Sequence, residues 1–501
     1  MSEISQFSQG LHEECGVFGM YDKTGATDMV SAVYSALYAL QHRGQESCGI
    51  ALNVDGVLSG HRDLGLVSEV FTKRVLEDLP RGAMMATGHV RYATAGQRSR
   101  SNAQPMVLHH CKGAMAVCHN GNLVNAPKLR RKLEMSGSIF HGTSDTEVIA
   151  YLLTQNRLLT PNIEMAVSRT MDDIEGAYSL VIMTHTKLIA ARDPNGFRPL
   201  CIGKLPEGRG WVVSSETCGL DIVGAEYVRD VEPGEIVRFN KEGVTSEQGV
   251  EPRKRASCIF EYVYFARPDS IMDGQSVYQA RRNMGRILAR EAPADADLVL
   301  GVPDSGIPSA MGFAFESGIP YSDGIVKNRY VGRTFIQPTQ AMRQLGIRLK
   351  LNPLPSVIRG KRLVVIDDSI VRGNTSKKLI EMLRDAGATE VHMRIVSPEV
   401  MWPCFYGIDT DTRDQLIAAN MTNDEMCEWM GADSLAFISL QGLRDSLPDV
   451  RTPGYCEACF SGEYPVDIPA YTARNSFMTK ADFAAAYEKE AQEAENTQVS
   501  V

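Results

Sequence analysis

Residues 362–376, which read RLVVIDDSIVRGNTS, constrain this chain more than any other stretch. An uninterrupted apolar run, residues 363–366, is typical of a parallel strand that is buried on both faces. Asp367 and Asp368 come where that strand ends, and a segment of small and hydroxyl-bearing residues then opens a helix. Ligands of open α/β sheets bind at the carboxyl ends of the strands. We therefore expect a phosphate-binding turn beside two carboxylates that suit Mg²⁺ or ribose hydroxyls.

Two aspartates after a strand can also be a simple helix cap, and the pair alone does not decide between these alternatives. The complete stretch is more specific: it resembles the signature with which type I phosphoribosyltransferases bind phosphoribosyl pyrophosphate (PRPP). It contains neither a Walker loop nor a Rossmann turn. The resemblance implies that Asp367 and Asp368 bind the ribose hydroxyls and Mg²⁺. The implied 5-phosphate site consists of Arg372, Gly373, Thr375 and Ser376.

The composition narrows the possible partners. Acidic residues outnumber basic ones, for a net charge of −9, and no block of Lys and Arg stands out, which argues against nucleic acid. No apolar stretch reaches transmembrane length, and residues 1–10 lack the features of a signal peptide. We expect a cytoplasmic protein without a membrane partner. Its eleven cysteines are then expected to be catalytic, metal-bound or buried rather than paired in disulfides.

The chain shows two different patterns along its 501 residues. Up to about residue 240, strands grouped around helices favour a layered α+β domain. The expected strands there are 49–52, 86–93, 114–118 and 178–183, and the expected helices are 29–40, 129–135 and 146–153. Strands at 298–302, 362–366 and 391–396, each before a loop, predict a parallel-sheet domain. We expect a leader at 1–14, domains at 15–240 and 295–470, a linker at 241–294 and a tail at 471–501.

A second candidate site begins at Cys15, directly after the polar leader. A lone Cys-Gly before an apolar strand is usually a buried core cysteine. Three motifs follow in order, GHVRYAT at 88–94, HNGN at 119–122 and TSDTE at 143–147. Singly they allow an ordinary salt bridge, a helix cap or a hairpin turn. Together with Cys15 they resemble the N-terminal-nucleophile (Ntn) glutamine amidotransferases.

This resemblance implies that residues 1–14 are a propeptide, whose removal makes Cys15 the first residue. The free α-amino group of Cys15 would then act as the general base. A thiol needs such a base to attack an unreactive amide. The side-chain amide of Asn120 and the backbone N–H of Gly121 would stabilise the oxyanion. The implied glutamine-binding residues are Arg91 for the α-carboxylate, Asp145 for the α-ammonium group and Arg43, which supports the closed site.

Taken together, the two halves resemble the family of glutamine phosphoribosylpyrophosphate amidotransferases over about residues 11–468. The resemblance implies a four-layer αββα Ntn glutaminase domain followed by a type I phosphoribosyltransferase domain. Ammonia released from glutamine at the first site would displace pyrophosphate from PRPP at the second. The product would be 5-phosphoribosylamine, formed in the first step of de novo purine biosynthesis. The family also implies a homotetramer and feedback inhibition by purine nucleotides.

The resemblance extends to two more segments of the PRPP site. Asp304 and Ser305 follow a predicted strand and match the family's pyrophosphate loop, with Ser305 near the metal, although a plain turn is the alternative. Lys327 and Tyr330 begin a basic segment that continues to residue 350. Such a segment is usually just solvated, but here it matches a lid that closes over PRPP.

Four cysteines form a further candidate site. Cys456 and Cys459 form a CxxC pair, which alone is compatible with zinc, a redox pair, a cluster or no function at all. With Cys404 and Cys258 they suit a tetrahedral metal or an iron–sulfur site. All four match the branch of the family that has a propeptide, which implies a [4Fe–4S] cluster.

Parts of this sequence are also compatible with two other functions. Other Ntn glutaminases aminate a sugar phosphate, aspartate or 2-oxoglutarate, but the PRPP signature argues against them. A non-enzymatic PRPP-binding regulator could keep residues 295–400. It would have no use for the four glutaminase residues together, which are Cys15, Arg91, Asn120 and Asp145.

Overall fold

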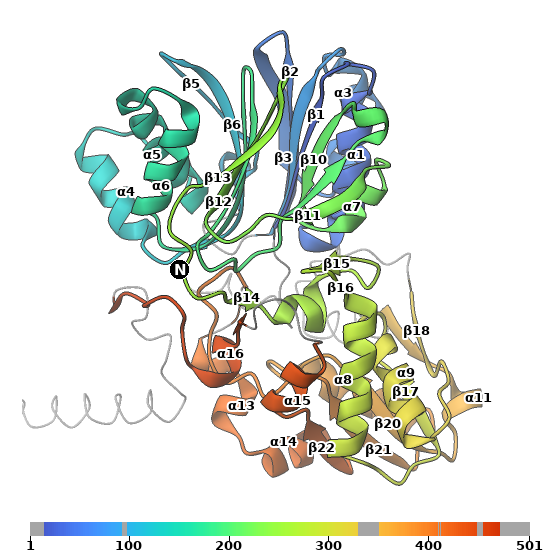
Figure 1. Cartoon of the computed structure of the whole chain (residues 1–501). Helices are drawn as coiled ribbons and strands as arrows, with labels where there is room; N and C mark the ends of the chain where they lie inside the picture. The colour runs from blue at the N-terminus through green and yellow to red at the C-terminus, as the bar shows by residue number, and fades with distance from the viewer. Residues whose placement is uncertain are drawn as a thin grey trace, which may run out of the picture.

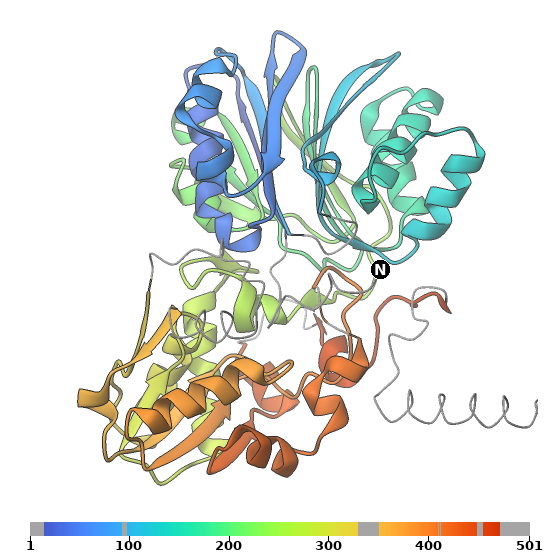
Figure 2. The same cartoon turned by 180° about the vertical axis from the view of Figure 1, so that it is seen from behind.

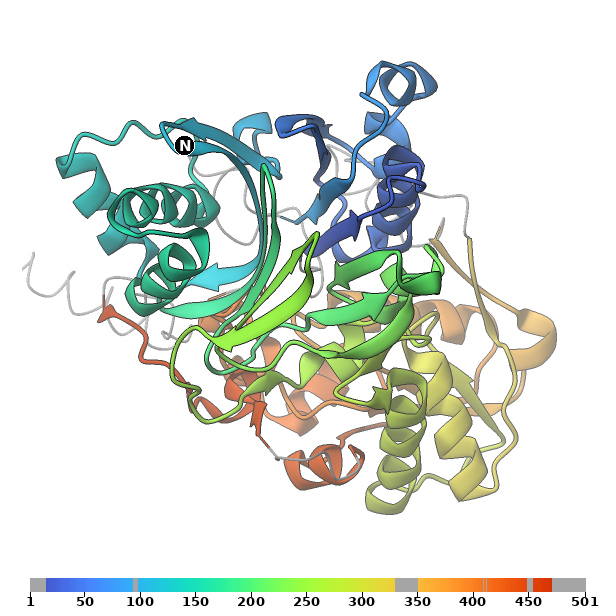
Figure 3. The same cartoon turned by 45° about the horizontal axis from the view of Figure 1, so that its top comes forward.

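Two β-sheets face each other in the N-terminal half of the chain, with helices on both outer sides (Figure 1, Figure 3). The computed structural model describes residues 15–92, 98–328, 350–408, 410, 412–447 and 454–470. The first sheet has the order β11-β9-β10-β1-β4-β2-β3 and the second the order β13-β12-β8-β7-β6-β5. Apolar side chains such as Val17, Val181 and Val213 fill the space between the sheets. This is the expected αββα arrangement.

The strands of the first sheet are β1 (Gly16–Asp22), β2 (Ser47–Val54), β3 (Val57–Leu64), β4 (Met85–Arg91), β9 (Cys201–Lys204), β10 (Gly210–Ser214) and β11 (Glu226–Asp230). Those of the second are β5 (Met106–His110), β6 (Gly113–Leu123), β7 (Gly176–Thr184), β8 (Leu188–Arg192), β12 (Glu235–Asn240) and β13 (Gly243–Gln248). The second sheet therefore continues past residue 240, the limit expected from the sequence.

Each outer layer packs through a stripe of apolar residues at helical spacing. On the first sheet lie α1 (Met29–Ala39), α2 (Val67–Val70), α3 (Lys73–Asp78) and α7 (Thr217–Asp221). In α1, Val33 and Leu37 are fully buried. On the second sheet lie α4 (Ala126–Met135), α5 (Asp145–Leu159) and α6 (Ile163–Asp173). The helices and strands expected from the sequence are all present here, most of them longer than expected.

The C-terminal domain is built on a parallel sheet with the order β17-β20-β21-β22. These strands are β17 (Leu298–Gly301), β20 (Arg362–Asp367), β21 (Glu390–Ile395) and β22 (Ser434–Phe437). Helices α8 (Val277–Glu291) and α9 (Gly306–Ser317) contribute to one apolar core of this domain, and α12 (Asn374–Asp385) and α14 (Asn423–Met430) to a second. The three strands expected from the sequence are confirmed, and β22 is additional.

Short elements complete the C-terminal domain and the region where the domains meet, which Figure 2 shows from behind. In the domain they are β18 (Ile325–Lys327), β19 (Leu351–Pro353), α11 (Pro355–Ile358), α13 (Ile417–Asn420), α15 (Leu440–Asp445) and α16 (Ala458–Ser461). Between the domains lie β14 (Ser257–Cys258), β15 (Ile271–Met272), β16 (Gln275–Ser276) and a π-helical turn, η4 (Glu261–Phe265) (Figure 1). β14 pairs in parallel with β23 (Tyr455–Cys456), which joins the linker to the C-terminal segment. Within the described residues, no helix has the length and apolar character needed to cross a membrane.

Candidate active sites

Cys15 lies directly before β1, a central strand of the first sheet, and is 6% exposed. Its Sγ lies 3.4 Å from the carbonyl oxygen of Tyr92, to which it donates. Burial raises the pKa of the thiol to about 11, although the charge of Arg91 lowers it. The thiol is therefore protonated at neutral pH and needs a base before it can act as a nucleophile.

The predicted oxyanion donors lie on β6. Asn120 is 1% exposed, and neither atom of its side-chain amide has a hydrogen-bond partner among the described residues. An unpaired buried polar group costs about 1–3 kcal/mol, so such an amide fits a position where a ligand completes the bond. Gly121 has a φ of +140°, and a Cβ there would lie 2.1 Å from the carbonyl oxygen of Ala177. Only glycine fits this position.

Arg91 and Asp145 are both buried, and the charges of both act on the Cys15 thiol. Arg91 forms an ion pair with Glu46. Asp145 begins α5 and accepts the N–H of Leu123 at 3.0 Å. Burial raises the pKa of Asp145, but His119, whose Nδ1 lies 3.7 Å away, and other contacts bring it below the usual value. A cation and an anion beside the thiol are suited to the two charges of an amino acid.

The Arg43 guanidinium forms a buried ion-pair network instead of facing open solvent. Its Nε donates to the carbonyl oxygen of Cys15 at 3.1 Å. Its Nη1 donates to Glu216 at 2.6 Å and its Nη2 to Glu261, in η4, also at 2.6 Å. Arg43 thus holds the backbone of Cys15 and connects it to the region between the domains. The predicted contact of Arg43 with glutamine stays a prediction.

Sequence reasoning missed three carboxylates of this region. Glu46 lies only three residues after Arg43 in the chain, and this closeness to a predicted site residue could have identified it. Glu216 and Glu261 follow no motif, and their roles depend on contacts between distant segments.

In the C-terminal domain, four of the predicted PRPP residues lie at the carboxyl ends of two adjacent strands. Asp304 and Ser305 follow β17, Asp367 ends β20 and Asp368 comes directly after it. The two adjacent aspartates are each 8% exposed. Burial raises the pKa of both carboxyl groups, and that of Asp367 is raised further by the charge of Asp368. Buried carboxylates that repel each other are suited to a divalent cation.

The predicted phosphate turn leads into α12. Gly373 precedes this helix with a φ of +77°, and a Cβ there would lie 2.8 Å from the Cδ1 of Ile417. No described side chain caps the helix, so the backbone N–H groups of its first turn, which includes Thr375 and Ser376, can donate hydrogen bonds to an anion. Arg372 lies directly before Gly373.

Only the start of the basic segment lies within the described residues. Lys327 ends β18 and donates to Asp304 at 2.5 Å, which ties this segment to the pyrophosphate loop. Tyr330 and residues 331–349 lie outside the described residues. Their predicted part in the lid stays a prediction.

The four predicted cluster cysteines come together from three segments. Cys258 and Cys456 are register partners in the β14–β23 pair. Cys459 lies in α16, and its carbonyl oxygen accepts the N–H groups of Met401 and Trp402, close before Cys404. Burial raises the pKa of Cys258 to about 11 and those of Cys456 and Cys459 well above their usual value, and neighbouring thiolates add to each shift. In the described parts of the chain, no three His, Cys, Asp or Glu side chains are grouped to hold a single metal ion.

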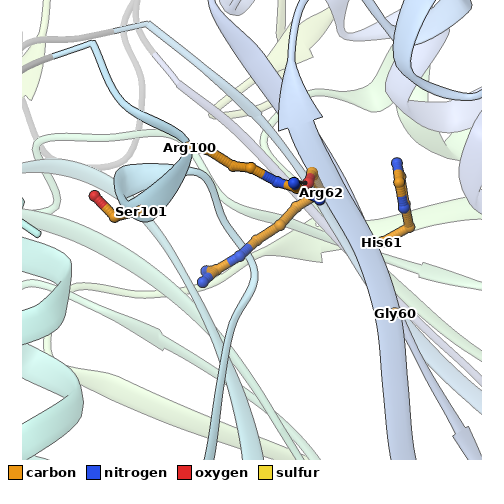
Figure 4. Close-up of a pocket in the computed structure, with 5 residues that line it drawn as sticks. All are labelled: Gly60, His61, Arg62, Arg100 and Ser101. Carbon is orange, nitrogen blue, oxygen red and sulfur yellow. Dashed lines mark hydrogen bonds between the residues drawn. The ribbon is translucent and has the colours of Figure 1, made fainter. Parts of the chain in front are cut away.

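A separate pocket of about 360 Å³ lies on the glutaminase domain, lined by Gly60, His61, Arg62, Arg100 and Ser101 (Figure 4). Arg62 Nη1 donates to the carbonyl oxygens of Ala103 at 2.6 Å and Pro105 at 3.1 Å. None of the predicted site residues lines this pocket.

The fold and the two sites define a two-domain enzyme that joins a glutamine amidotransferase to a phosphoribosyltransferase. The model of the glutamine amidotransferase domain matches residues 89–221, and that of the phosphoribosyl transferase domain matches residues 269–396. The amidophosphoribosyltransferase of Synechococcus elongatus is 51% identical over 93% of this chain and 94% of its own. That of Bacillus subtilis is 48% identical over 92% of this chain and 96% of its own.

Two solved structures match nearly the whole chain. The glutamine PRPP amidotransferase from B. subtilis, complexed with ADP and GMP, has a TM-score of 0.84 at 46% identity and covers 91% of this chain and 99% of its own. A structure described as the allosteric regulatory enzyme of purine biosynthesis has a TM-score of 0.85 at 46% identity and covers 93% of this chain and 100% of its own. The chain therefore belongs to the amidophosphoribosyltransferase family. It is a pentosyltransferase that uses glutamine to aminate PRPP in purine biosynthesis.

Proposed function

We propose that Cys15 is the glutaminase nucleophile and that its α-amino group, freed by removal of residues 1–14, is the general base. The thiol proton passes to this amine while Sγ attacks the side-chain amide of glutamine. The tetrahedral intermediate expels ammonia and leaves a thioester, which water hydrolyses to glutamate. The buried thiol with its raised pKa supports this proposal, because it cannot ionise at neutral pH unaided.

The oxyanion of this intermediate is bound by the Asn120 amide and the Gly121 N–H. The observation that carries this assignment is the buried, unpaired amide of Asn120. Arg91 and Asp145 hold the α-carboxylate and α-ammonium groups of glutamine, and their opposite charges near the thiol support these roles. Arg43 fixes the Cys15 backbone through the carbonyl group.

At the second site, Asp367 and Asp368 bind the ribose hydroxyls and, with Ser305, Mg²⁺. Bound Mg²⁺ would neutralise the pyrophosphate leaving group. Asp304 and Lys327 belong to the pyrophosphate side, and the 5-phosphate lies on the first turn of α12, with Arg372, Gly373, Thr375 and Ser376. The raised pKa values of the two buried carboxyl groups support a cation here.

We further propose that Cys258, Cys404, Cys456 and Cys459 hold a [4Fe–4S] cluster. The N–H of Tyr406 donates to Cys404 Sγ at 3.3 Å. Burial raises the pKa values of Cys258 and Cys456, but the backbone N–H groups of Phe260 and Ala458 lower them. Such hydrogen bonds stabilise thiolates and are typical of cluster sites. These four thiolates would hold the cluster, which would tie the linker to the C-terminal segments.

The homotetramer and the inhibition by purine nucleotides also remain proposals for this chain. The ADP and GMP in the complex of the B. subtilis enzyme support nucleotide binding.

The test compares two nitrogen donors. Wild-type enzyme should hydrolyse glutamine in the presence of PRPP and release pyrophosphate. Cys15→Ala should lose synthesis from glutamine but keep synthesis from ammonia, because ammonia enters the second site directly. Equal loss of both activities would contradict two separable sites.

A further inference from the structure

The loop that follows Cys404 leaves the four-cysteine site and lies against the glutaminase domain. Asn122, near the end of β6, donates its Nδ2 hydrogen to the carbonyl oxygen of Phe405 at 2.8 Å. Asn122 comes two residues after Asn120 and directly after Gly121. The strand that carries both oxyanion donors is thus bonded to a loop 283 positions away in sequence.

Arg198 makes a second contact with the same loop. Its fully buried guanidinium donates to the carbonyl oxygen of Tyr406 from Nε at 2.9 Å and from Nη2 at 2.7 Å. The carbonyl oxygen of Arg198 accepts the hydroxyl hydrogen of Ser179 at 3.2 Å. Ser179 is the register partner of Asn120 in the β6–β7 pair. Arg198 therefore connects the loop to the strand that faces Asn120.

The backbone of the loop also packs directly on Gly121. Gly407 has a φ of +119°, and a Cβ there would lie 2.9 Å from Arg198 Nη2 and 3.3 Å from the Cα of Gly121. A side chain at Gly407 would push against the residue whose N–H faces the oxyanion.

The other end of the loop is fixed by the cysteine site. The N–H of Tyr406 donates to Cys404 Sγ at 3.3 Å. The Tyr406 ring stacks on Phe197 with 4.3 Å between ring centroids, and its hydroxyl donates to the carbonyl oxygen of Val466 at 2.6 Å. The loop is therefore held on one side by Cys404 and on the other by β6.

We propose that residues 405–407 brace the oxyanion hole, with Asn122 and Arg198 as positioning residues for glutamine hydrolysis. The proposal rests on the assignment of Cys15, Asn120 and Gly121 given above. The four-cysteine site, which links the domains, would then also support glutamine hydrolysis through the loop that follows Cys404. Chemistry at PRPP does not depend on this brace.

The effect expected from loss of the brace follows from oxyanion geometry. Removing one oxyanion donor costs about 10²–10³ in kcat. Displacing donors without removing them should cost less, so we expect Asn122→Ala to lower kcat for glutamine hydrolysis about tenfold to a hundredfold, with KM for glutamine nearly unchanged. Synthesis from ammonia should stay near wild type.

Asn125→Ala is the matched control. Asn125 lies three residues further on and also donates its Nδ2 hydrogen to a carbonyl oxygen, that of Asp173, at 3.0 Å, but this bond stays within the glutaminase domain. Hydrogen exchange of the peptide that covers β6 should become faster in Asn122→Ala and not in Asn125→Ala. Alkylation of Cys15 by iodoacetamide should be unchanged in both, because it needs no oxyanion hole.

The proposal is overturned if Asn122→Ala keeps its glutamine kcat, or if Asn125→Ala loses as much. Parallel loss of synthesis from ammonia would also overturn it. Should Asn122→Ala fail to fold, Arg198→Lys, which keeps the charge but not the two-nitrogen contact with Tyr406, carries the same expectations. Failure of the glutaminase assignment itself would appear separately, as glutamine hydrolysis that survives in Cys15→Ala.

Discussion

Ser305, directly before α9, donates its hydroxyl hydrogen to Asp368, directly after β20, with 2.5 Å between the two oxygens. The two residues come from different predicted motifs, and this bond brings both motifs into one site. This hydrogen bond fixes the orientation of the Asp368 side chain. The pyrophosphate loop and the ribose-binding strand end are therefore positioned together.

Asp367→Asn and Asp368→Asn should each abolish synthesis from glutamine and from ammonia, because the carboxylates serve the PRPP site. Pyrophosphate release with either nitrogen donor is the measurement. A variant with nearly wild-type ammonia-dependent turnover would show that the aspartates only cap the helix.

The same Asp367→Asn variant should be more stable than the wild type when Mg²⁺ is removed. Burial and the Asp368 charge raise the pKa of Asp367 in the folded chain, so folding disfavours the ionised form of this carboxyl group. The stability gap, measured by denaturation in EDTA, should be fully present above the raised folded pKa. It should close as the pH falls from that pKa to below the usual value of about 4, where wild-type Asp367 is protonated in both states. Asp78→Asn, at a side chain 75% exposed, is the control and should show no gap.

Glu261→Gln should destabilise the chain, because it removes a carboxylate that neutralises buried Arg43. Breaking a buried ion pair costs about 3–5 kcal/mol. Chemical denaturation measures the loss. The control is Glu77→Gln, because the exposed carboxylate of Glu77 lies 3.8 Å from Lys73 Nζ. This change should lower the free energy of unfolding by less than about 1 kcal/mol. A loss for Glu261→Gln that is as small as the loss for Glu77→Gln would mean that the buried network adds nothing to stability.

The mature enzyme should begin at Cys15. The reason is that our proposal gives the Cys15 thiol no base other than its own α-amino group. Measurement of the intact mass of active protein checks this prediction. Full activity in a chain that retains residues 1–14 would refute the propeptide.

Protein purified without air should be brown and contain about four iron atoms per chain. It should lose colour and activity in air. Replacing any one of the four cysteines by Ser should lower the yield of folded, processed protein, because the ligands come from the linker and two C-terminal segments. A colourless, air-stable protein that contains zinc would contradict the cluster and leave both catalytic sites untouched.

Local motifs could be predicted because they depend on residues close in sequence. The buried run before Asp367 and the turn at Gly373 each follow from strand, helix and turn chemistry over a few residues. Gly121 was assigned through the family resemblance, and it lies inside β6 instead of in a hairpin turn. The two-domain fold class and the family followed from the order of such motifs along the chain.

Contacts between distant segments were decided by the tertiary structure alone. Arg43 meets Glu261 across 218 positions, and Asn122 meets the carbonyl of Phe405 across 283. No local spacing predicts these contacts, because they depend on how the glutaminase domain packs against the linker and the C-terminal domain. The sequence by itself therefore determined which chemical groups the protein carries and on which local elements they lie. Only the packing of the domains decided which charges neutralise one another and which loop supports the oxyanion strand, since burial and long-range distance exist only in the folded chain.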